Sequence, residues 1–280
     1  MIGVGPFSVQ SIVVGCAVFL AWFTARRAVG TQAKAPRKAA GGLLLDAVFW
    51  GFVAGRLAYI AWWWEEYSAA PKSMVAIGDG GFAWWVGIPV AAAYLWWRTR
   101  SIRGLRNPTL TGLVTGVVVW VAANSVLSLV LRSAPPMPDL QLMTLEEHPV
   151  TLHDYAGRPV VLNLWASWCP PCRREMPAFQ QAEAQFPRVA FVMLNQGESP
   201  QQAQAFLEEQ GLALKDVLLD PASSAMRTLH SRGLPTTLFF DENGRLVDTH
   251  LGELTLASLK STIARRFDPS HRAPAGEVQP

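Results

Sequence analysis

Apolar residues form long runs in the first half of the chain and short runs in the second half. Four long runs, separated by polar loops, each approach the ~20 residues that cross ~30 Å of hydrocarbon as a helix. They cover residues 9–24, 42–64, 82–97 and 110–131. The pattern therefore predicts an α-helical membrane domain at 1–132 with about four transmembrane helices.

From residue 140 onward, runs of strand length alternate with helical patterns. Residues 160–165 (VVLNLW) are almost continuously apolar, as expected of a central strand buried on both faces. A hairpin is expected at Asp-Glu-Asn-Gly, 241–244. The other predicted elements are strands at 189–194, 236–240 and 245–251, and helices at 170–186, 200–210, 221–230 and 255–267. This alternation predicts an α/β domain over 140–267, with its sheet covered on both faces.

Two segments fit neither pattern. Residues 133–139 hold three prolines in four positions, which favours a semi-rigid, extended linker. Residues 268–280 are polar and rich in proline, which is typical of a disordered tail.

Charge is divided unevenly between the two halves. Residues 1–138 carry 12 Lys+Arg against 4 Asp+Glu, whereas the remainder carries 12 against 17. In the first half the basic residues gather in the first and third loops, while the second loop has only Lys72. Short basic loops stay cytoplasmic. We therefore expect a protein of the inner (cytoplasmic) membrane with its N-terminus outside and its α/β domain in the periplasm.

The positive charge and the tryptophans both point to a lipid bilayer as a partner. Ten of the 12 Trp precede residue 121, mostly at the ends of apolar runs, as in the aromatic belts of membrane proteins. The second half has no basic patch interleaved with aromatic residues, so nucleic acid is not an expected partner.

The candidate chemistry lies in Cys169-Pro-Pro-Cys172, which follows a predicted strand and opens a predicted helix. Pro170 suits the first helical turn, and the helix N-terminus stabilises a thiolate at Cys169. Such a thiolate attacks a disulfide, and Cys172, one turn further on, resolves the mixed disulfide. The motif predicts a thiol:disulfide oxidoreductase.

Two other uses of this cysteine pair are disfavoured. Zinc needs about four ligands, and the remaining cysteine, Cys16, lies in a predicted membrane span. A purely structural disulfide that closes so short a loop constrains little chain. No metal and no cofactor is expected.

The segment from Trp165 to Cys172, with the following Arg-Arg-Glu-Met-Pro, resembles the thioredoxin-like TlpA/ResA family of membrane-tethered extracytoplasmic disulfide reductases. The resemblance covers about 139–267 and implies a thioredoxin-like fold. Gly233-Leu-Pro-Thr-Thr237 matches the cis-proline loop of the family, which implies a cis peptide before Pro235 and a loop that faces the dithiol. The substrate contacts expected on this basis are Trp168, Pro170, Leu234 and Thr236.

Glu175 matches an acidic residue near the dithiol in this family. The implied role is to adjust the thiol pKa and to shuttle protons, and the alternative is a solvated glutamate favoured by the helix dipole. Asn163 stands where cytoplasmic thioredoxin has a buried Asp, and it cannot titrate. The predicted catalytic residues are therefore Cys169, Cys172, Glu175 and Pro235.

The first half resembles prolipoprotein diacylglyceryl transferase over about 1–97. Gly5-Pro-Phe-Ser8, the stretch from Asp46 to Tyr59, and Asp79-Gly-Gly81 carry the likeness. Trp85 falls about where the family has a histidine, and no histidine precedes His148. We interpret this half as a remnant without transferase activity, in which Arg56 with Asp46 or Asp79 is a candidate lipid-headgroup site.

Together, these patterns predict a membrane-anchored extracytoplasmic oxidoreductase that reduces protein disulfides. The resemblance implies a membrane electron donor of the DsbD/CcdA type, with cytochrome c maturation or repair of oxidised proteins as uses. A lone Cys16 cannot relay electrons through the membrane domain, because thiol–disulfide relay needs a pair. The alternatives are an oxidase of the same fold, a lipid-modifying transferase with a redox-regulated appendage, and a non-catalytic scaffold.

Overall fold

The computed structural model describes residues 3–4, 7–29, 37–100, 102–132 and 136–267. The chain divides into two compact units. The helical unit comprises Val9–Met74 and Gly80–Leu127, and the sheet unit comprises Met1–Ser8, Val75–Asp79 and Ser128–Pro280. The predicted tail at 268–280 lies outside the described residues.

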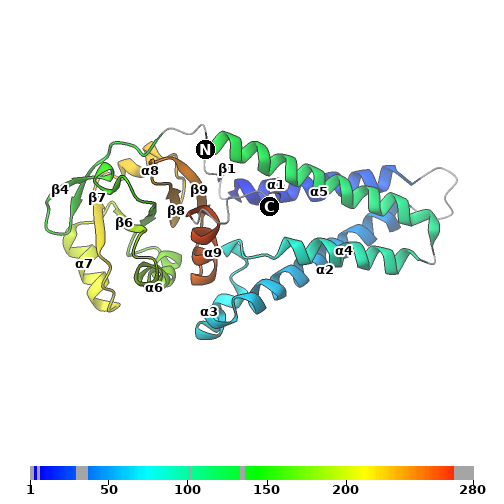
Figure 1. Cartoon of the computed structure of the whole chain (residues 1–280), viewed down its shortest axis with the longest axis horizontal. Helices are drawn as coiled ribbons and strands as arrows, with labels where there is room; N and C mark the ends of the chain where they lie inside the picture. The colour runs from blue at the N-terminus through cyan, green and yellow to red at the C-terminus, as the bar shows by residue number, and fades with distance from the viewer. Residues whose placement is uncertain (1–2, 5–6, 30–36, 101, 133–135, 268–280) are drawn as a thin grey trace, which may run out of the picture. The chain divides into compact units, whose positions relative to one another are not determined.

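Within the described part of the helical unit, long helices cover all four apolar runs (Figure 1). They are α1 (Val9–Arg27), α2 (Arg37–Trp62), α4 (Trp84–Thr99) and α5 (Arg103–Arg132). The connection between α2 and α4, predicted only as a loop, contains α3 (Trp64–Ala69) and the 3-10 turns η1 (Pro71–Val75) and η2 (Ile77–Asp79). Two short strands, β1 (Gly3–Val4) and β2 (Phe7–Ser8), precede α1.

Two of these helices are long and apolar enough to cross a membrane, over Lys38–Trp62 and Gly104–Leu127. The 16 residues of α4 extend only ~24 Å, which is short of the ~30 Å hydrocarbon core. The predicted helical membrane domain is thus confirmed in its helical character, whereas the number of four spans stays a prediction.

Glycines allow α2 and α4 to cross closely. A Cβ atom built on Gly51 would lie 2.8 Å from the backbone oxygen of Gly87, and one built on Gly87 would lie 2.7 Å from that of Gly51. A similar approach joins α5 to α1, where Gly112 faces Ala21. Small residues at such crossings let backbones pack by van der Waals contact, which is how helices associate in lipid.

Arg56 is buried within the helical unit. Its guanidinium donates to the backbone oxygens of Gly81 at 2.9 Å and Met74 at 3.1 Å, and it faces the rings of Tyr67 and Phe82. This side chain therefore ties α2 to the segment that leads into α4. Its predicted role in holding a lipid headgroup remains a prediction.

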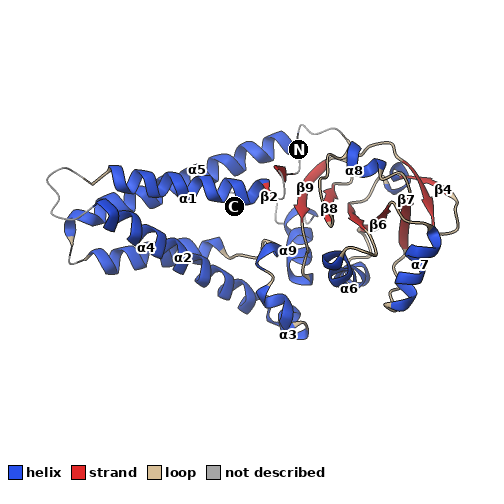
Figure 2. Ribbon diagram, turned by 180° about the vertical axis from the view of Figure 1, so that it is seen from behind, coloured by secondary structure: helices blue, strands red, loops and turns tan. Residues whose placement is uncertain are grey.

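The sheet unit contains a seven-stranded sheet with the order β4-β3-β7-β6-β5-β8-β9 (Figure 2). Strands β5, β6 and β7 are parallel, and the remaining neighbours pair antiparallel. The strands are β3 (Gln141–Thr144), β4 (Pro149–Thr151), β5 (Val160–Trp165), β6 (Ala190–Gln196), β7 (Asp216–Asp220), β8 (Thr236–Phe240) and β9 (Leu246–Leu251). Every residue of β5 is buried, as its continuous apolar run predicts.

Helices cover both faces of this sheet. Because crossovers between parallel strands share one hand, α6 (Pro170–Gln185) and α7 (Pro200–Glu209) lie on the same face, where α9 (Leu256–Phe267) joins them. The other face is covered by η3 (Leu152–Tyr155) and α8 (Ser224–Thr228). Alternate residues of the central strands, such as Val161 and Leu162, therefore belong to different cores.

The structure corrects several predicted elements. Strands β3, β4 and β7 were not predicted, and the helix predicted at 221–230 covers only Ser224–Thr228. Part of the predicted linker also packs onto the sheet unit, because Met137 is buried and its N–H donates to the oxygen of Gly244 at 2.8 Å. We therefore assign residues 136–139 to the sheet unit rather than to a spacer; residues 133–135 lie outside the described chain.

Candidate active site

The two cysteines lie where β5 ends and α6 begins. Cys169 is the N-cap of α6, and its Sγ accepts a hydrogen bond from the backbone N–H of Cys172 at 3.4 Å. The two residues form a disulfide with their Cα atoms 5.3 Å apart. Both side chains are buried, Cys169 to 3% exposure and Cys172 to 0%. The predicted position at a helix N-terminus is thus present, and it favours a thiolate at Cys169 once the disulfide is reduced.

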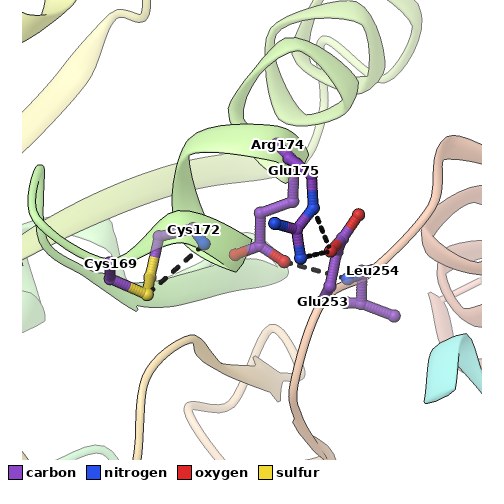
Figure 3. Close-up of polar contacts among 6 residues, drawn as sticks. All are labelled: Cys169, Cys172, Arg174, Glu175, Glu253 and Leu254. Carbon is purple, nitrogen blue, oxygen red and sulfur yellow. Dashed lines mark hydrogen bonds and ion pairs between the residues drawn. A yellow bond between two sulfur atoms is a disulfide. The ribbon is translucent and has the colours of Figure 1, made fainter. Parts of the chain in front are cut away.

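Glu175 lies one turn after Cys172 on α6 and is 1% exposed. One carboxylate oxygen accepts from the backbone N–H of Leu254 at 2.9 Å, and the other accepts from Asn163 Nδ2 at 2.7 Å. Figure 3 shows the side chain between the disulfide and the 253–254 segment. Burial raises the pKa of Glu175 to about 8, against the lowering effect of these two hydrogen bonds. It is therefore a buried group that exchanges a proton near neutral pH, and not a solvated first-turn glutamate.

Asn163 suits either protonation state of this carboxyl. Its Nδ2 also donates to Thr237 Oγ1 at 3.1 Å, while its Oδ1 is buried without a partner among the described residues. The two ends of an amide differ only by assignment, so a turned amide presents Oδ1 to Glu175 instead. Asn163 thus donates to the ionised carboxyl or accepts from the protonated one.

An ion pair lies beside Glu175. Arg174 Nη2 lies 2.6 Å from Glu253 Oε2, and Arg174 is well exposed (Figure 3). The Glu253 charge raises the pKa of Glu175 and the Arg174 charge lowers it, both less than burial does.

The loop before β8 lies at the same end of the sheet as the dithiol. The Leu234–Pro235 peptide is cis, as the resemblance implies. Leu164 of β5 pairs with Thr236 of β8, so Pro235 lies beside the end of β5. Strand β5 ends at Trp165, and Cys169 follows four residues later. The side chain of Thr236 is buried, and its Oγ1 donates to the oxygen of Gly233 at 2.7 Å. Its predicted contact with substrate would therefore have to use its backbone.

Trp168 and Pro170 are the exposed members of the predicted site, and Trp168 has 68% of its surface accessible. Leu234 is half-buried and contacts both cores of the sheet unit. An exposed indole beside a buried disulfide is a natural contact for an incoming peptide.

One polar group at this site was missed by sequence analysis. Glu198, in the loop between β6 and α7, accepts from the backbone N–H of Ser167 at 2.7 Å and from the Ser167 hydroxyl. Asn195 Nδ2 donates to the same carboxylate at 2.6 Å. The only signal in the sequence was a carboxylate directly after a predicted strand, which alone does not indicate a contact with the dithiol loop.

Comparisons with known proteins match the two halves of the chain to different families, and the two matches meet near the boundary between the helical unit and the sheet unit. A family model described as prolipoprotein diacylglyceryl transferase matches residues 1–124, and one described as the AhpC/TSA family matches residues 134–249. Thioredoxin-like protein YneN of Bacillus subtilis is 32% identical over 137 residues, which are 48% of this chain and 79% of YneN. Thiol-disulfide oxidoreductase ResA of Geobacillus kaustophilus is 32% identical over 133 residues, which are 47% of this chain and 74% of ResA.

The chain belongs to the ResA-like thiol-disulfide oxidoreductases. Its α/β domain is accordingly thioredoxin-like, and the predicted enzyme class is confirmed. Among solved structures, StoA from Bacillus subtilis aligns with 28% identity over 45% of this oxidoreductase and 98% of StoA, with a TM-score of 0.40. The similarity of the first half to the transferase extends beyond the predicted 1–97.

Proposed function

We propose that this oxidoreductase is anchored in the cytoplasmic membrane and reduces protein disulfides outside the cytoplasm through Cys169 and Cys172. The observation that carries the proposal is the placement of Glu175, a buried carboxyl with a pKa of about 8, one helical turn after Cys172. A disulfide that served only for stability would gain nothing from a buried acid beside it, because burying an ionisable carboxyl costs free energy even where it accepts two hydrogen bonds.

The reaction transfers two electrons to the substrate. The Cys169 thiolate attacks a substrate sulfur, which breaks the substrate disulfide, forms a mixed disulfide and releases one substrate thiolate. The Cys172 thiolate then attacks the Cys169 sulfur, which releases the second substrate thiolate and closes the Cys169–Cys172 disulfide seen in the structure. Glu175 suits the deprotonation of Cys172 in this second step, since it lies one turn away and titrates near neutral pH.

Substrate recognition is proposed for the surface around the dithiol. The exposed ring of Trp168 contacts the substrate, and the backbone around Leu234 and Pro235 pairs with the substrate peptide near the sulfurs. Pro170 borders the same approach, because it is the first residue of α6.

The proposed orientation rests on the helical unit and its loops. Two helices satisfy the length and hydropathy of a membrane span, and basic residues concentrate in the first and third loops. With the four spans that the sequence predicts, this distribution of charge supports a topology in which the N-terminus and the thioredoxin-like domain lie outside. An extracytoplasmic enzyme cannot draw on cytoplasmic reductants directly, so we propose a membrane electron donor of the DsbD/CcdA type.

The helical unit is proposed as an anchor rather than a transferase. Its family model describes a diacylglyceryl transferase, yet the chain has no histidine before His148. Diacylglyceryl transfer needs a group that moves a proton, and the resemblance assigns that role to the missing histidine.

The test uses a Cys16→Ala background, so that Cys169 and Cys172 are the only thiols. In cells, Cys172→Ala should accumulate mixed disulfides through Cys169, and the recovered partners should be extracytoplasmic proteins and the electron donor. The matched control is Cys169→Ala with Cys172 intact, which should trap far less. Equal trapping by both variants, or none, would refute the assigned roles.

Two further measurements test the direction of electron transfer and the side of the membrane on which the thioredoxin-like domain lies. Acid quenching followed by thiol alkylation should find the pair mostly reduced in growing cells; a mostly oxidised pair would indicate an oxidase. In intact spheroplasts, a membrane-impermeant maleimide should label Cys169 of the doubly substituted Cys16→Ala, Cys172→Ala chain. Labelling only after lysis would place the domain in the cytoplasm.

A further inference from the structure

Exposure changes abruptly along the segment that leads into the dithiol. Trp165 and Ala166 are completely buried, Trp168 is 68% exposed, and Cys169 is again buried. Ser167, which is half-buried, therefore marks the point where the chain turns outward and back. Whatever fixes Ser167 fixes the direction in which the next residue projects.

Glu198 holds Ser167 by two hydrogen bonds. Its carboxylate accepts from the backbone N–H at 2.7 Å and from the hydroxyl of the same residue. Both bonds end on an ionisable carboxylate, and hydrogen bonds to charged groups are the stronger class. The backbone of Ser167 is thus attached to another loop 31 residues away in the chain.

Glu198 is itself held firmly. Its side chain is 6% exposed, and Asn195 of β6 donates to it at 2.6 Å. On one side stands Gly197, with a positive φ of 79°, and on the other stands Ser199, the N-cap of α7, whose Oγ accepts from Gln202 N. The carboxylate is therefore fixed between the end of a buried strand and the start of a helix.

Trp168 has no comparable support. Within the described residues, its indole makes no hydrogen bond, ring stacking or cation–π contact. Its position depends on the backbone at Ser167 and Cys169. Cys169 is set by α6, and its N–H donates to the oxygen of Ala166 at 3.2 Å. Arg173 Nη1 donates to the oxygen of Ser167 at 3.5 Å, and the shortest bonds to Ser167 are those to Glu198.

We propose that Glu198 is a positioning residue for substrate binding: by fixing Ser167, it holds the Trp168 ring in place for a protein substrate. This inference rests on the proposed function, and it assigns to Glu198 an effect on recognition rather than on sulfur chemistry. Cys169 keeps its place as the N-cap of α6 without Glu198.

The experiment compares the reduction of a protein disulfide with the reduction of a small-molecule disulfide. The full-length chain in detergent is assayed with insulin in the presence of dithiothreitol as the reductant. With the small aromatic disulfide DTNB, the chain is first reduced and then freed of dithiothreitol, because dithiothreitol itself reduces DTNB. Glu198→Ala should raise KM for insulin by up to about tenfold, because the two bonds that it removes lie within the protein and affect the substrate only through the position of Trp168. The rate with DTNB should change less than about threefold, since that reagent needs only Cys169.

A double-mutant cycle shows whether Glu198 acts through Trp168. Trp168→Ala should raise KM for insulin by itself, and Glu198→Ala added to it should bring little further change, because coupled residues are not additive. Full additivity, or an equal loss of kcat with both substrates, would overturn the proposal. Glu198→Gln, which keeps one acceptor oxygen, and Ser167→Ala, which keeps the backbone bond, should give intermediate KM values even if Glu198→Ala fails to fold.

Failure of the proposed function would give a different result from failure of the role assigned to Glu198. Insulin reduction that survives Cys169→Ala would remove the assigned nucleophile itself. In contrast, an unchanged KM in both Glu198→Ala and Glu198→Gln would remove only the role of Glu198.

Discussion

Glu175→Gln should make the thioredoxin-like domain more stable, and the gain should grow with pH. In the wild-type protein, burial raises the pKa of Glu175 from 4.5 to about 8 in the folded state. The folded domain then holds a proton that the unfolded chain has already released. The stability that this proton confers is complete below pH 4.5 and is lost as pH rises to about 8.

The magnitude follows from the two pKa values. Each unit of difference between the two pKa values is worth ~1.4 kcal/mol. Relative to low pH, Glu175 therefore lowers the free energy of unfolding by roughly 3 kcal/mol at pH 7 and by roughly 5 kcal/mol above pH 8. Glutamine removes this titration. Its oxygen can still accept from Leu254 N–H, and a turned Asn163 amide presents to its NH2 group an oxygen that has no partner now.

Native-state hydrogen exchange of the oxidised, full-length chain measures the effect on peptides from β5 and α6. Between pH 5 and pH 7, the opening free energy of Glu175→Gln minus that of wild type should rise by ~1.4 kcal/mol per pH unit. His250 has the opposite sign, because burial lowers its pKa and its contribution is lost as pH falls, but it is common to both proteins and cancels in the difference. Glu209→Gln, at an exposed site on α7, controls for the loss of a carboxylate.

Parallel profiles for wild type and Glu175→Gln over pH 5–8 would refute the reasoning. They would mean that Glu175 is already ionised in the folded protein at pH 5 and that its two hydrogen bonds outweigh burial.

Three further outcomes are expected. Glu253→Gln should lower the pKa of Glu175, because it removes a nearby negative charge, and the exchange profile should move to lower pH; a move to higher pH would contradict this. Gly51→Ala should lower the free energy of unfolding of the helical unit, measured by heating in detergent, by about 1–3 kcal/mol, because its Cβ would overlap a backbone oxygen of α4. Gly42→Ala on the same helix is the control: its Cβ meets nothing within 4 Å and should have little effect. Ser199→Ala removes the capping box of α7 and should cost about 1 kcal/mol in urea unfolding; an unchanged midpoint would mean that the cap is not needed.

The sequence was most informative where local chemistry and burial agree. The continuous apolar run at 160–165 predicted β5, and the Cys-Pro-Pro-Cys motif predicted the start of α6, because prolines and a thiol N-cap suit a helix N-terminus. The helix predicted at 255–267 is present as α9, and Oγ1 of Thr255, directly before it, accepts from Ser258 N. At these places, the residues that determine the local structure all lie within one short segment of the sequence.

The missed features depend on partners distant in the chain. Strand β7 has only three apolar residues between two aspartates, and it becomes a strand because β6 and β3 pair with it on either side. Glu198 was missed for the same reason, since its bonds reach a loop 31 residues away. Nothing local distinguishes it from an exposed acidic residue in a loop.

The burial of both sulfurs next to an exposed tryptophan in the chain has a kinetic consequence. A sulfur with 3% exposure is reached rarely by dissolved oxidants, whereas a polypeptide bound at the Trp168 ring, as proposed, would hold its own sulfur at the start of α6. Electrons delivered to this enzyme would leak slowly to the surroundings and pass quickly to a docked partner, so burial of the sulfur would add selectivity to the reactivity that the helix N-terminus gives it.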